Sequence, residues 1–263
     1  MALLFFILMT PGAHAESELE DWSVSDESVE TTINHSAWGE FLGRYVQADE
    51  SGINFVAYAD VGSKDRSALK AYIKRLTNED PRQLRKAEQL AYWVNLYNAL
   101  TVEVVLRHPN EDSIQDMGDG FFSSGPWSDK LIEIGRESLS LDDIEHRILR
   151  PIWRDHRIHY AVNCASISCP NLAPVPYTAK NVEEMFSAAE QHYINHPRGV
   201  SFDDRGRLTL SKIYTWYSSD FANDEAELLH YLSTHHATAA DRLHEYTGSV
   251  RYDYDWKLNA AID

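Results

Sequence analysis

Both cysteines of the 263-residue chain lie in one short stretch that also holds the side chains most able to activate a thiol. Residues 157–170 read RIHYAVNCASISCP and include His159, Asn163, Cys164 and Cys169. A cysteine is a nucleophile only as its thiolate, so it needs a base or a positive environment nearby. His159, five residues before Cys164, is the candidate base. Residues five apart on a regular strand point to opposite faces, so the chain must turn or bulge near Asn163 for the two to meet.

A helix expected before this stretch supplies the carboxylate that such a histidine needs. Helical spacing places Glu145 on the apolar face of this helix, where an unpaired carboxylate is costly. Glu145, His159 and Cys164 would then form a carboxylate–histidine–thiol triad. His146, at the flank of the same helix, is the competing base.

Each of these residues also has a structural interpretation. In an oxidising compartment the two cysteines could form a small-loop disulfide, or both could be inert thiols. His159 could be a hydrogen-bonded core histidine, and Glu145 could pair with a buried arginine such as Arg150 or Arg157. Thiol counting under native conditions separates these alternatives, because a cysteine hydrolase needs at least one free, reactive thiol.

Composition and charge restrict the partners. Hydrophobic residues make up 43% of the chain and charged residues 25%, as in ordinary globular proteins. The formal net charge is -17 and no cluster of Lys and Arg occurs, which argues against a nucleic-acid partner. The 12 histidines include no HExxH pattern, so the sequence predicts neither a zinc site nor another cofactor. A small-molecule or peptide substrate is the expected partner.

The N-terminus has features of an exported protein. An apolar run over residues 2–9, a break at Pro11 and the small-x-small sequence AHA predict a signal peptide over residues 1–15, although no Lys or Arg precedes the run. The run is too short to cross a bilayer, which needs roughly 20 apolar residues. Residues 16–35, rich in Ser, Glu and Asp, are expected to be a disordered leader. The mature protein would be periplasmic or secreted.

Residues 36–263 are expected to form a single α+β domain around a central buried helix with antiparallel hairpins. Asp80-Pro81 predicts the start of that helix, which runs to Leu106 and is apolar nearly all round from Leu90 onward. Because helices and hairpins mix without a βαβ rhythm, the fold class is α+β. The other expected elements are helices over 36–46, 65–76, 140–150, 181–194, 224–235 and 239–246, hairpins over 131–141 and 200–210, and strands over 54–58, 158–163 and 250–256.

Two expectations concern individual segments. Ser140 and Asp143 resemble a capping box at the start of the helix that carries Glu145. The aromatic stretch Tyr214–Phe221 is expected to be part of the core rather than a stacking platform.

Five segments resemble the DUF547 family, which is found in bacteria, plants and animals. They span roughly residues 79–260 and occur in the family's order. The segments are QLAYWVNLYNALTVEVVL from Gln89, LSLDDIEHRILR from Leu139, RIHYAVNCASISCPNL from Arg157, SKIYTWYSSDF from Ser211 and YDYDWKLNA from Tyr252.

The resemblance implies a papain-like fold with a Cys–His–Glu arrangement, as suggested for some members. Cys164 and His159 match the cysteine and histidine of the family's HFALNCG-like motif, and Glu145 and His146 match its IEH motif. The match favours a nucleophilic thiol over an obligatory disulfide.

Two positions vary from the family pattern. Cys169 falls where some members have Ser, which weakens the case for an obligatory disulfide. Ala165 stands where the family usually has Gly, so its methyl group would restrict the backbone beside the thiol.

The resulting hypothesis is an exported cysteine hydrolase or acyltransferase acting on an amide, peptide or γ-glutamyl-type bond. Cys164 would attack the carbonyl, His159 would take its proton and return it to the leaving amine, and Glu145 would stabilise the imidazolium. Asn163 or Asn98, with the backbone amides around Cys164, would hold the oxyanion. The alternative is a non-enzymatic envelope binding protein with a structural disulfide between the two cysteines.

Overall fold

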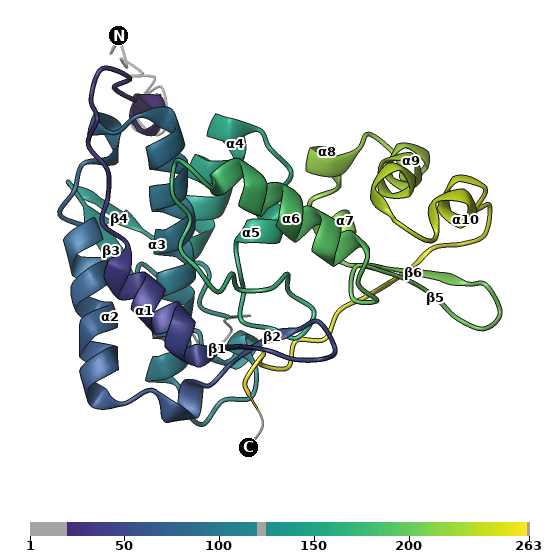
Figure 1. Cartoon of the computed structure of the whole chain (residues 1–263), viewed down its shortest axis with the longest axis horizontal. Coiled ribbons are helices and arrows are strands. Elements are labelled where there is room, and N and C mark those ends of the chain that lie inside the picture. The colour runs from purple at the N-terminus through teal and green to yellow at the C-terminus, as the bar shows by residue number, and fades with distance from the viewer. Residues whose placement is uncertain (1–19, 120–124, 262–263) are drawn as a thin grey trace, which may run out of the picture.

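The computed structural model describes residues 20–119 and 125–261. Long helices and short strands are mixed along the chain, which confirms the α+β class (Figure 1). The expected signal peptide and the first four residues of the expected leader lie outside the described residues.

Three helices form the larger, N-terminal part of the molecule: α1 (Ser36–Tyr45), α2 (Ser63–Leu76) and α3 (Lys86–Arg107) (Figure 1). α3 is buried along almost its whole length, as its apolar sequence predicts. Its buried amides are hydrogen-bonded: Asn95 Nδ2 donates to the carbonyl of Tyr177 at 2.7 Å. The prediction of a central buried helix is therefore correct, although it begins at Lys86 and Asp80-Pro81 starts a separate 3-10 turn.

The other elements are short and follow in chain order. The helices are α4 (Arg150–Trp153), α5 (Ile158–Ala161), α6 (Val182–Ile194), α7 (Ile213–Trp216), α8 (Ser218–Phe221), α9 (Glu225–His235) and α10 (Ala240–His244). The strands are β1 (Val46–Ala48), β2 (Asn54–Val56), β3 (Ile132–Ile134), β4 (Glu137–Leu139), β5 (Val200–Phe202), β6 (Leu208–Ser211) and β7 (Arg251–Asp253).

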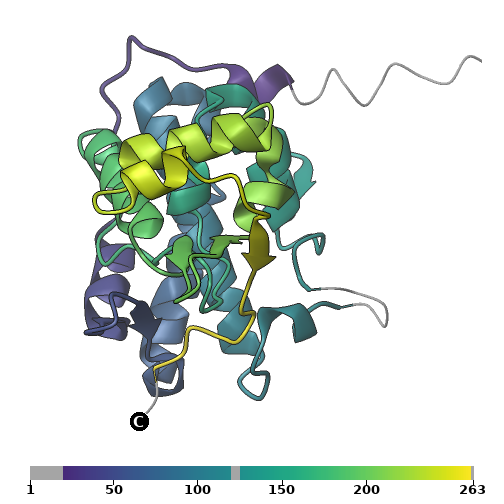
Figure 2. The same ribbon diagram turned by 90° about the vertical axis from the view of Figure 1, so that its right-hand side faces the viewer.

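The strands make three small sheets. The pairs β1–β2, β3–β4 and β5–β6 are antiparallel, and the last two are the predicted hairpins. β7 adds to β6 in parallel, with Leu210 opposite Tyr252. After β7 the chain runs down across the face of the molecule to the C-terminus (Figure 2). This path carries the last segment past the loop that holds the two cysteines.

Residues 143–149 form a π-helical turn that continues directly into α4. Its start is the predicted capping box: the Ser140 amide donates to Asp143 Oδ2 at 2.8 Å, and the Asp143 amide donates to Ser140 Oγ at 3.1 Å. The expected end before Pro151 is wrong, because the helical turn continues through Pro151 to the end of α4 at Trp153. Glu145 is buried on the inner face of this turn.

The expected strand over 158–163 is wrong. The structure has the short helix α5 there, and the chain becomes extended only at Val162. All four residues of α5 are buried, including His159 and Tyr160. Burial on every side removes the contrast between faces, so an alternating pattern could not distinguish strand from helix.

The expected disordered leader is also wrong where the structure describes it. Trp22 is buried against Trp93 of α3, with the two rings 5.3 Å apart and perpendicular. Ile33 is buried as well, and its amide donates to Glu88 at 2.6 Å. A polar composition was a poor guide because two apolar side chains and buried polar partners anchor this segment.

The buried side chains form two clusters, one around α1 to α3 and one around α6, α9 and the β5–β6 hairpin. α5 lies between them, since Ile158 belongs to the first and Tyr160 to the second. In the part of the chain that the structure describes, no helix combines the length and apolar character needed to cross a membrane.

Candidate active site

The loop that carries both cysteines is closed at its neck by Asn163. Asn163 Nδ2 donates to the carbonyl of Pro170 at 2.7 Å, and its Oδ1 accepts from the amide of Ala165 at 2.9 Å. Ala165 has φ 59°, in the left-handed region where a non-glycine residue costs about 1–2 kcal/mol. This turn sets Cys164 opposite Cys169, so that the Cys164 amide donates to Cys169 Sγ at 2.9 Å.

The C-terminal segment is hydrogen-bonded along this loop. The amide of Ile167 donates to the carbonyl of Lys257 at 2.7 Å. In the other direction, the amide of Asn259 donates to the carbonyl of Ala165 at 3.0 Å. These bonds bring Tyr254, which directly follows β7, to the thiol of Cys164. Side chains more than eighty residues apart in the sequence therefore meet at the sulfur.

Two hydroxyl groups contact the half-buried thiol of Cys164. Its Sγ lies 3.0 Å from the Tyr254 hydroxyl and 3.3 Å from Ser166 Oγ, and Ser166 also donates to Tyr254 at 3.0 Å. Burial alone would raise the pKa of this thiol, but hydrogen bonds from Cys169, Ser166 and Tyr254 outweigh it and lower the pKa to about 7. The thiolate is therefore well populated near neutral pH. Cys169 behaves oppositely, since burial and the adjacent Cys164 sulfur raise the pKa of its thiol.

Cys164 faces a cavity of about 460 Å³. One wall consists of touching aromatic rings: Trp256 lies 5.5 Å from Trp127, 5.3 Å from Trp216 and 4.6 Å from Tyr254, measured between ring centroids. Trp216 is 44% exposed, an unusual state for so large an apolar side chain. The cavity is also lined by the candidate acid–base residues Glu145, His146 and His159.

His159 is held between two carboxylates. Its Nε2 lies 2.7 Å from Asp220 Oδ2, and its Nδ1 lies 3.5 Å from Glu145 Oε1, too far for a good hydrogen bond. Its ring stacks on Tyr217 with 4.0 Å between centroids. Burial alone would lower the pKa of His159, but Asp220 and Glu145 together raise it. The imidazolium form is therefore favoured.

The two carboxylates differ in their other partners. Asp220 also accepts two hydrogen bonds from Arg150, from Nε at 2.5 Å and from Nη2 at 2.9 Å. Glu145 accepts from the hydroxyl of Tyr97 at 3.1 Å and is almost fully buried. Burial raises the pKa of Glu145, but its contacts with His159 and Tyr97 outweigh burial and lower the pKa. Both acids are therefore ionised beside the imidazole.

The structure brings Glu145, His159 and Cys164 to one cavity and pairs the first two. Among the residues described, no hydrogen bond joins the histidine to the sulfur, and Asp220 occupies the position that a thiol would take on Nε2. His146 also lines the cavity without such a bond to Cys164; it lies 3.1 Å from an Arg150 nitrogen and 3.5 Å from Asp142 Oδ1. The identity of the base stays a prediction.

The expected oxyanion donors are engaged elsewhere. Asn98 donates to the carbonyl of Ala161 at 3.0 Å and accepts from the amide of Asn163 at 2.8 Å. Asn163 closes the cysteine loop, and the amide of Cys164 is bonded to the other thiol. Both asparagines therefore shape the backbone around the nucleophile, and the Tyr254 hydroxyl, which accepts from Ser166, is the polar donor at the sulfur.

Sequence reasoning missed Asp220 and Tyr254. Both lie in segments noted for their family resemblance, SKIYTWYSSDF and YDYDWKLNA, which contain ionisable and aromatic residues suited to a site. The expectation that Tyr214–Phe221 is core is only partly correct. Tyr214 is buried, whereas Trp216 and Tyr217 line the cavity.

Both cysteines are free thiols in the structure. The disulfide of the alternative hypothesis is therefore not formed. Over residues 20–119 and 125–261, no group of three or more His, Cys, Asp or Glu side chains is arranged to hold a metal ion.

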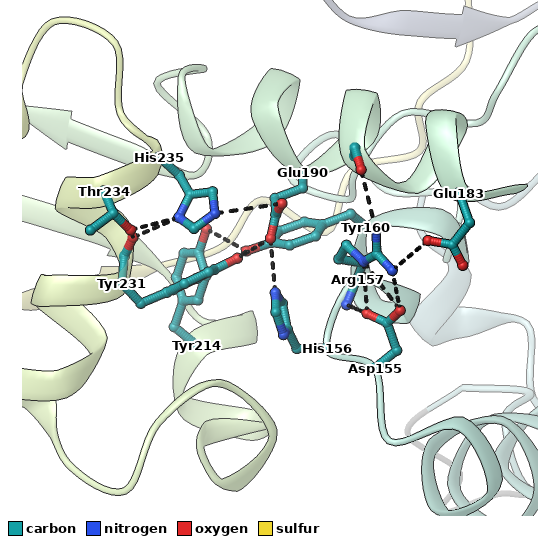
Figure 3. A network of polar contacts seen from close by, with 11 residues as sticks. Asp155, His156, Arg157, Tyr160, Glu183, Glu190, Tyr214, Tyr231, Thr234 and His235 are labelled. Carbon is teal, nitrogen blue, oxygen red and sulfur yellow. Dashed lines mark hydrogen bonds and ion pairs between the residues drawn. The ribbon is translucent and has the colours of Figure 1, made fainter.

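A second polar network surrounds Glu190 and includes Tyr160 of α5 (Figure 3). Glu190 of α6 accepts from His156 Nε2 at 2.8 Å and from the hydroxyl of Tyr231 at 2.7 Å, and His235 Nε2 lies 3.8 Å from it. The Tyr231 hydroxyl in turn lies 3.0 Å from that of Tyr160. This network joins α5, α6 and α9 through a buried carboxylate.

Comparison with known proteins supports the family resemblance. The family model described as protein of unknown function, DUF547, matches residues 81–194, which confirms the resemblance over the segment that carries Glu145, His159 and both cysteines. No curated protein and no solved structure matches the chain. Asp220, Tyr254 and the aromatic wall at Trp216 and Trp256 come from beyond the matched segment.

Proposed function

We propose that this chain, whose residues 81–194 match the DUF547 family model, is a cysteine-dependent hydrolase or acyltransferase that acts on an amide, peptide or γ-glutamyl-type bond. The observation that carries the proposal is the thiol of Cys164. It is half-buried at the wall of a cavity, and hydroxyl donors lower its pKa to about 7. A thiolate populated at neutral pH is the form that attacks carbonyl carbon.

The attack would begin from the thiolate that Tyr254 and Ser166 hold. Cys164 Sγ would bond to the carbonyl carbon, and the negative charge would move to the carbonyl oxygen. The Tyr254 hydroxyl is the nearest donor that can stabilise that oxygen, because it lies 3.0 Å from the sulfur and the raised pKa of Tyr254 keeps it protonated.

The leaving amine then needs a proton. His159 is the proposed donor, because Asp220 and Glu145 raise its pKa and it lines the same cavity. Its ring nitrogens face carboxylates in the unliganded protein. Substrate binding has to bring the imidazole and the leaving group together, a tightening that is common in enzymes with loose unliganded geometry. Water or a second amine would finally release the acyl group from the sulfur.

The aromatic wall suggests which part of the substrate binds beside the reacting bond. Trp127, Trp216 and Trp256 present flat apolar surface that would be covered by an apolar or ring-bearing group of the substrate. Polar groups also line the cavity, among them Glu145, His159 and Tyr254. This combination is typical of sites that bind small molecules or peptide segments. The N-terminal apolar run further leads us to propose that the reaction takes place in the cell envelope.

The test is covalent trapping of Cys164 by an acyl-like electrophile, combined with a panel of fluorogenic amides. A peptide chloromethyl ketone should modify Cys164 and abolish turnover of any amide in the panel. Cys164→Ser should lose both properties, while Cys169→Ser, the matched control, should still be labelled at Cys164. If the probe modifies neither cysteine faster than it modifies a small thiol in solution, Cys164 is not an activated nucleophile and the proposal fails.

A further inference from the structure

The loop geometry places two chemically different thiols within reach of each other. Asn163 ties the loop across its neck to Pro170, so the next residues inward, Cys164 and Cys169, face one another. The Cys164 amide bonds to Cys169 Sγ at 2.9 Å, although both thiols are reduced. A disulfide needs Cα atoms about 4.4–6.8 Å apart, which opposed residues at the neck of a tight loop can approach with little movement.

Access separates the two sulfurs. Cys164 is partly exposed at the cavity wall, whereas Cys169 is only 3% exposed. Arg198 holds the backbone of the second cysteine. Its Nη1 donates to the carbonyl of Cys169 at 2.7 Å and to the carbonyl of Ile167 at 2.9 Å. A small oxidant entering the cavity therefore meets Cys164 first.

We propose that Cys164 and Cys169 form a peroxide-responsive pair, in which Cys164 is oxidised to a sulfenic acid and Cys169 converts it to a reversible disulfide. The formation of this bond does not depend on the proposed hydrolase activity. The effect of the bond on activity does depend on it. In the disulfide, Cys164 is no longer a thiolate and cannot attack a carbonyl, so oxidation would switch the enzyme off.

The first step is balanced by the peroxide itself. The thiolate of Cys164 attacks one peroxide oxygen, an S–O bond forms, the O–O bond breaks, and the departing hydroxide takes a proton to become water. Sulfur loses two electrons and the peroxide gains them. The hydroxyls of Tyr254 and Ser166, which stabilise the thiolate, lie beside the reacting sulfur.

The second step is prepared by the electrostatics of the pair. While Cys164 is a thiolate, its charge and hydrogen bond raise the pKa of Cys169 further than burial alone. Conversion to the neutral sulfenic acid removes that contribution, so Cys169 ionises more readily. Its sulfur then attacks Cys164 Sγ, the S–S bond forms, the S–O bond breaks, and the departing hydroxide takes the proton that Cys169 released and leaves as water. A dithiol reverses the change by thiol–disulfide exchange and is itself oxidised to a disulfide.

The test uses the full chain, reduced with dithiothreitol, freed of reductant and exposed to equimolar hydrogen peroxide. We expect intact mass to fall by two hydrogens, both cysteines to become inert to iodoacetamide, and peptide mapping to show a Cys164–Cys169 bond. Dithiothreitol should restore both thiols. Cys169→Ser should instead gain oxygen at Cys164 that dimedone captures before further oxidation.

Three results would overturn the inference. One is wild-type protein that accumulates sulfenic or sulfinic acid at Cys164 while Cys169 stays alkylatable. Another is a pair that remains fully reduced under conditions that oxidise a small thiol. The third is a disulfide that dithiothreitol cannot reduce in the native protein, since it would then be a structural bond. Because these outcomes concern mass and thiol content, they are independent of whether any amide is hydrolysed.

Discussion

Two buried glutamates among the described residues, Glu145 and Glu190, pair with histidines and differ in what surrounds them. Glu145 and His159 lie at a cavity with a free thiol, and the contact between them is loose at 3.5 Å. Glu190 lies between α6 and α9, where His156 and Tyr231 donate to it at 2.8 and 2.7 Å (Figure 3). Similar residue types thus occur in a network suited to chemistry and in one suited to holding helices together.

The comparison shows that a carboxylate–histidine pair is weak evidence for catalysis when taken alone. In both pairs the pKa of the glutamate is lowered, because its contacts with histidine and tyrosine outweigh the effect of burial. The difference lies in position: the chain has two cysteines, and both lie by the cavity of the first pair. Consecutive residues of α5 even serve the two networks, with His159 in one and Tyr160 in the other.

The largest expected difference comes from removing the charge at each glutamate. Glu145→Gln should lower kcat/KM on an amide substrate by about 10²–10⁴-fold, the usual contribution of acid–base machinery, because His159 loses a charge that favours its protonation. Glu190→Gln should leave kcat/KM nearly unchanged and lower the free energy of unfolding by about 1–3 kcal/mol, because it weakens buried hydrogen bonds. Steady-state kinetics measure kcat/KM, and urea denaturation measures the free energy of unfolding. If both variants are stable and lose kcat/KM equally, the first pair is no more catalytic than the second.

A smaller effect, on the pH dependence of kcat/KM, is expected from Asp220→Asn. Asp220 raises the pKa of His159, so its neutralisation should lower that pKa. If protonated His159 is the acid, the alkaline limb of the kcat/KM profile should move to lower pH. Asp142→Asn is the control, since Asp142 faces His146 instead. A shift in the control alone would assign the acid to His146 and exclude His159.

A change confined to the thiol is expected from Tyr254→Phe. Alkylation of Cys164 should be half-maximal near its pKa of about 7 in the wild type. Without the Tyr254 hydroxyl the thiolate loses a donor, so the midpoint should move to higher pH. Tyr252→Phe is the matched control, because its hydroxyl bonds to Glu225 away from the sulfur. Identical midpoints in all three proteins would show that the hydroxyl does not stabilise the thiolate.

The smallest effect is expected from Tyr231→Phe in the second network. Loss of one hydrogen bond to Glu190 should reduce the free energy of unfolding by about 0.5–1.5 kcal/mol at neutral pH. The folded-state pKa of Glu190 is lowered, so its contribution is present above the unfolded pKa and is lost as pH falls through the folded value. The difference between variant and wild type should therefore shrink in acid. Urea denaturation at neutral and acidic pH tests it, and a difference that grows in acid would contradict it.

Local patterns were reliable where one interaction dominates. The apolar sequence from Leu90 onward predicted the buried helix α3, and Ser140 with Asp143 predicted a capping box that the structure contains. Prediction of the element over 158–163 was wrong because burial on all sides left no contrast between faces. The expected leader was wrong because burial of Trp22 against α3 depends on a distant partner.

The sequence by itself determined the α+β class, the central helix and the segment in which Cys164, His159 and Glu145 are brought to one cavity. Only the tertiary structure decided what each of these groups contacts. Asp220 faces His159 from 61 residues away, and Tyr254 reaches Cys164 from 90 residues away. The physical reason is that pairing of the last segment with the cysteine loop, and docking of α8 against α5, depend on packing between distant surfaces. Local spacing carries no information about such contacts.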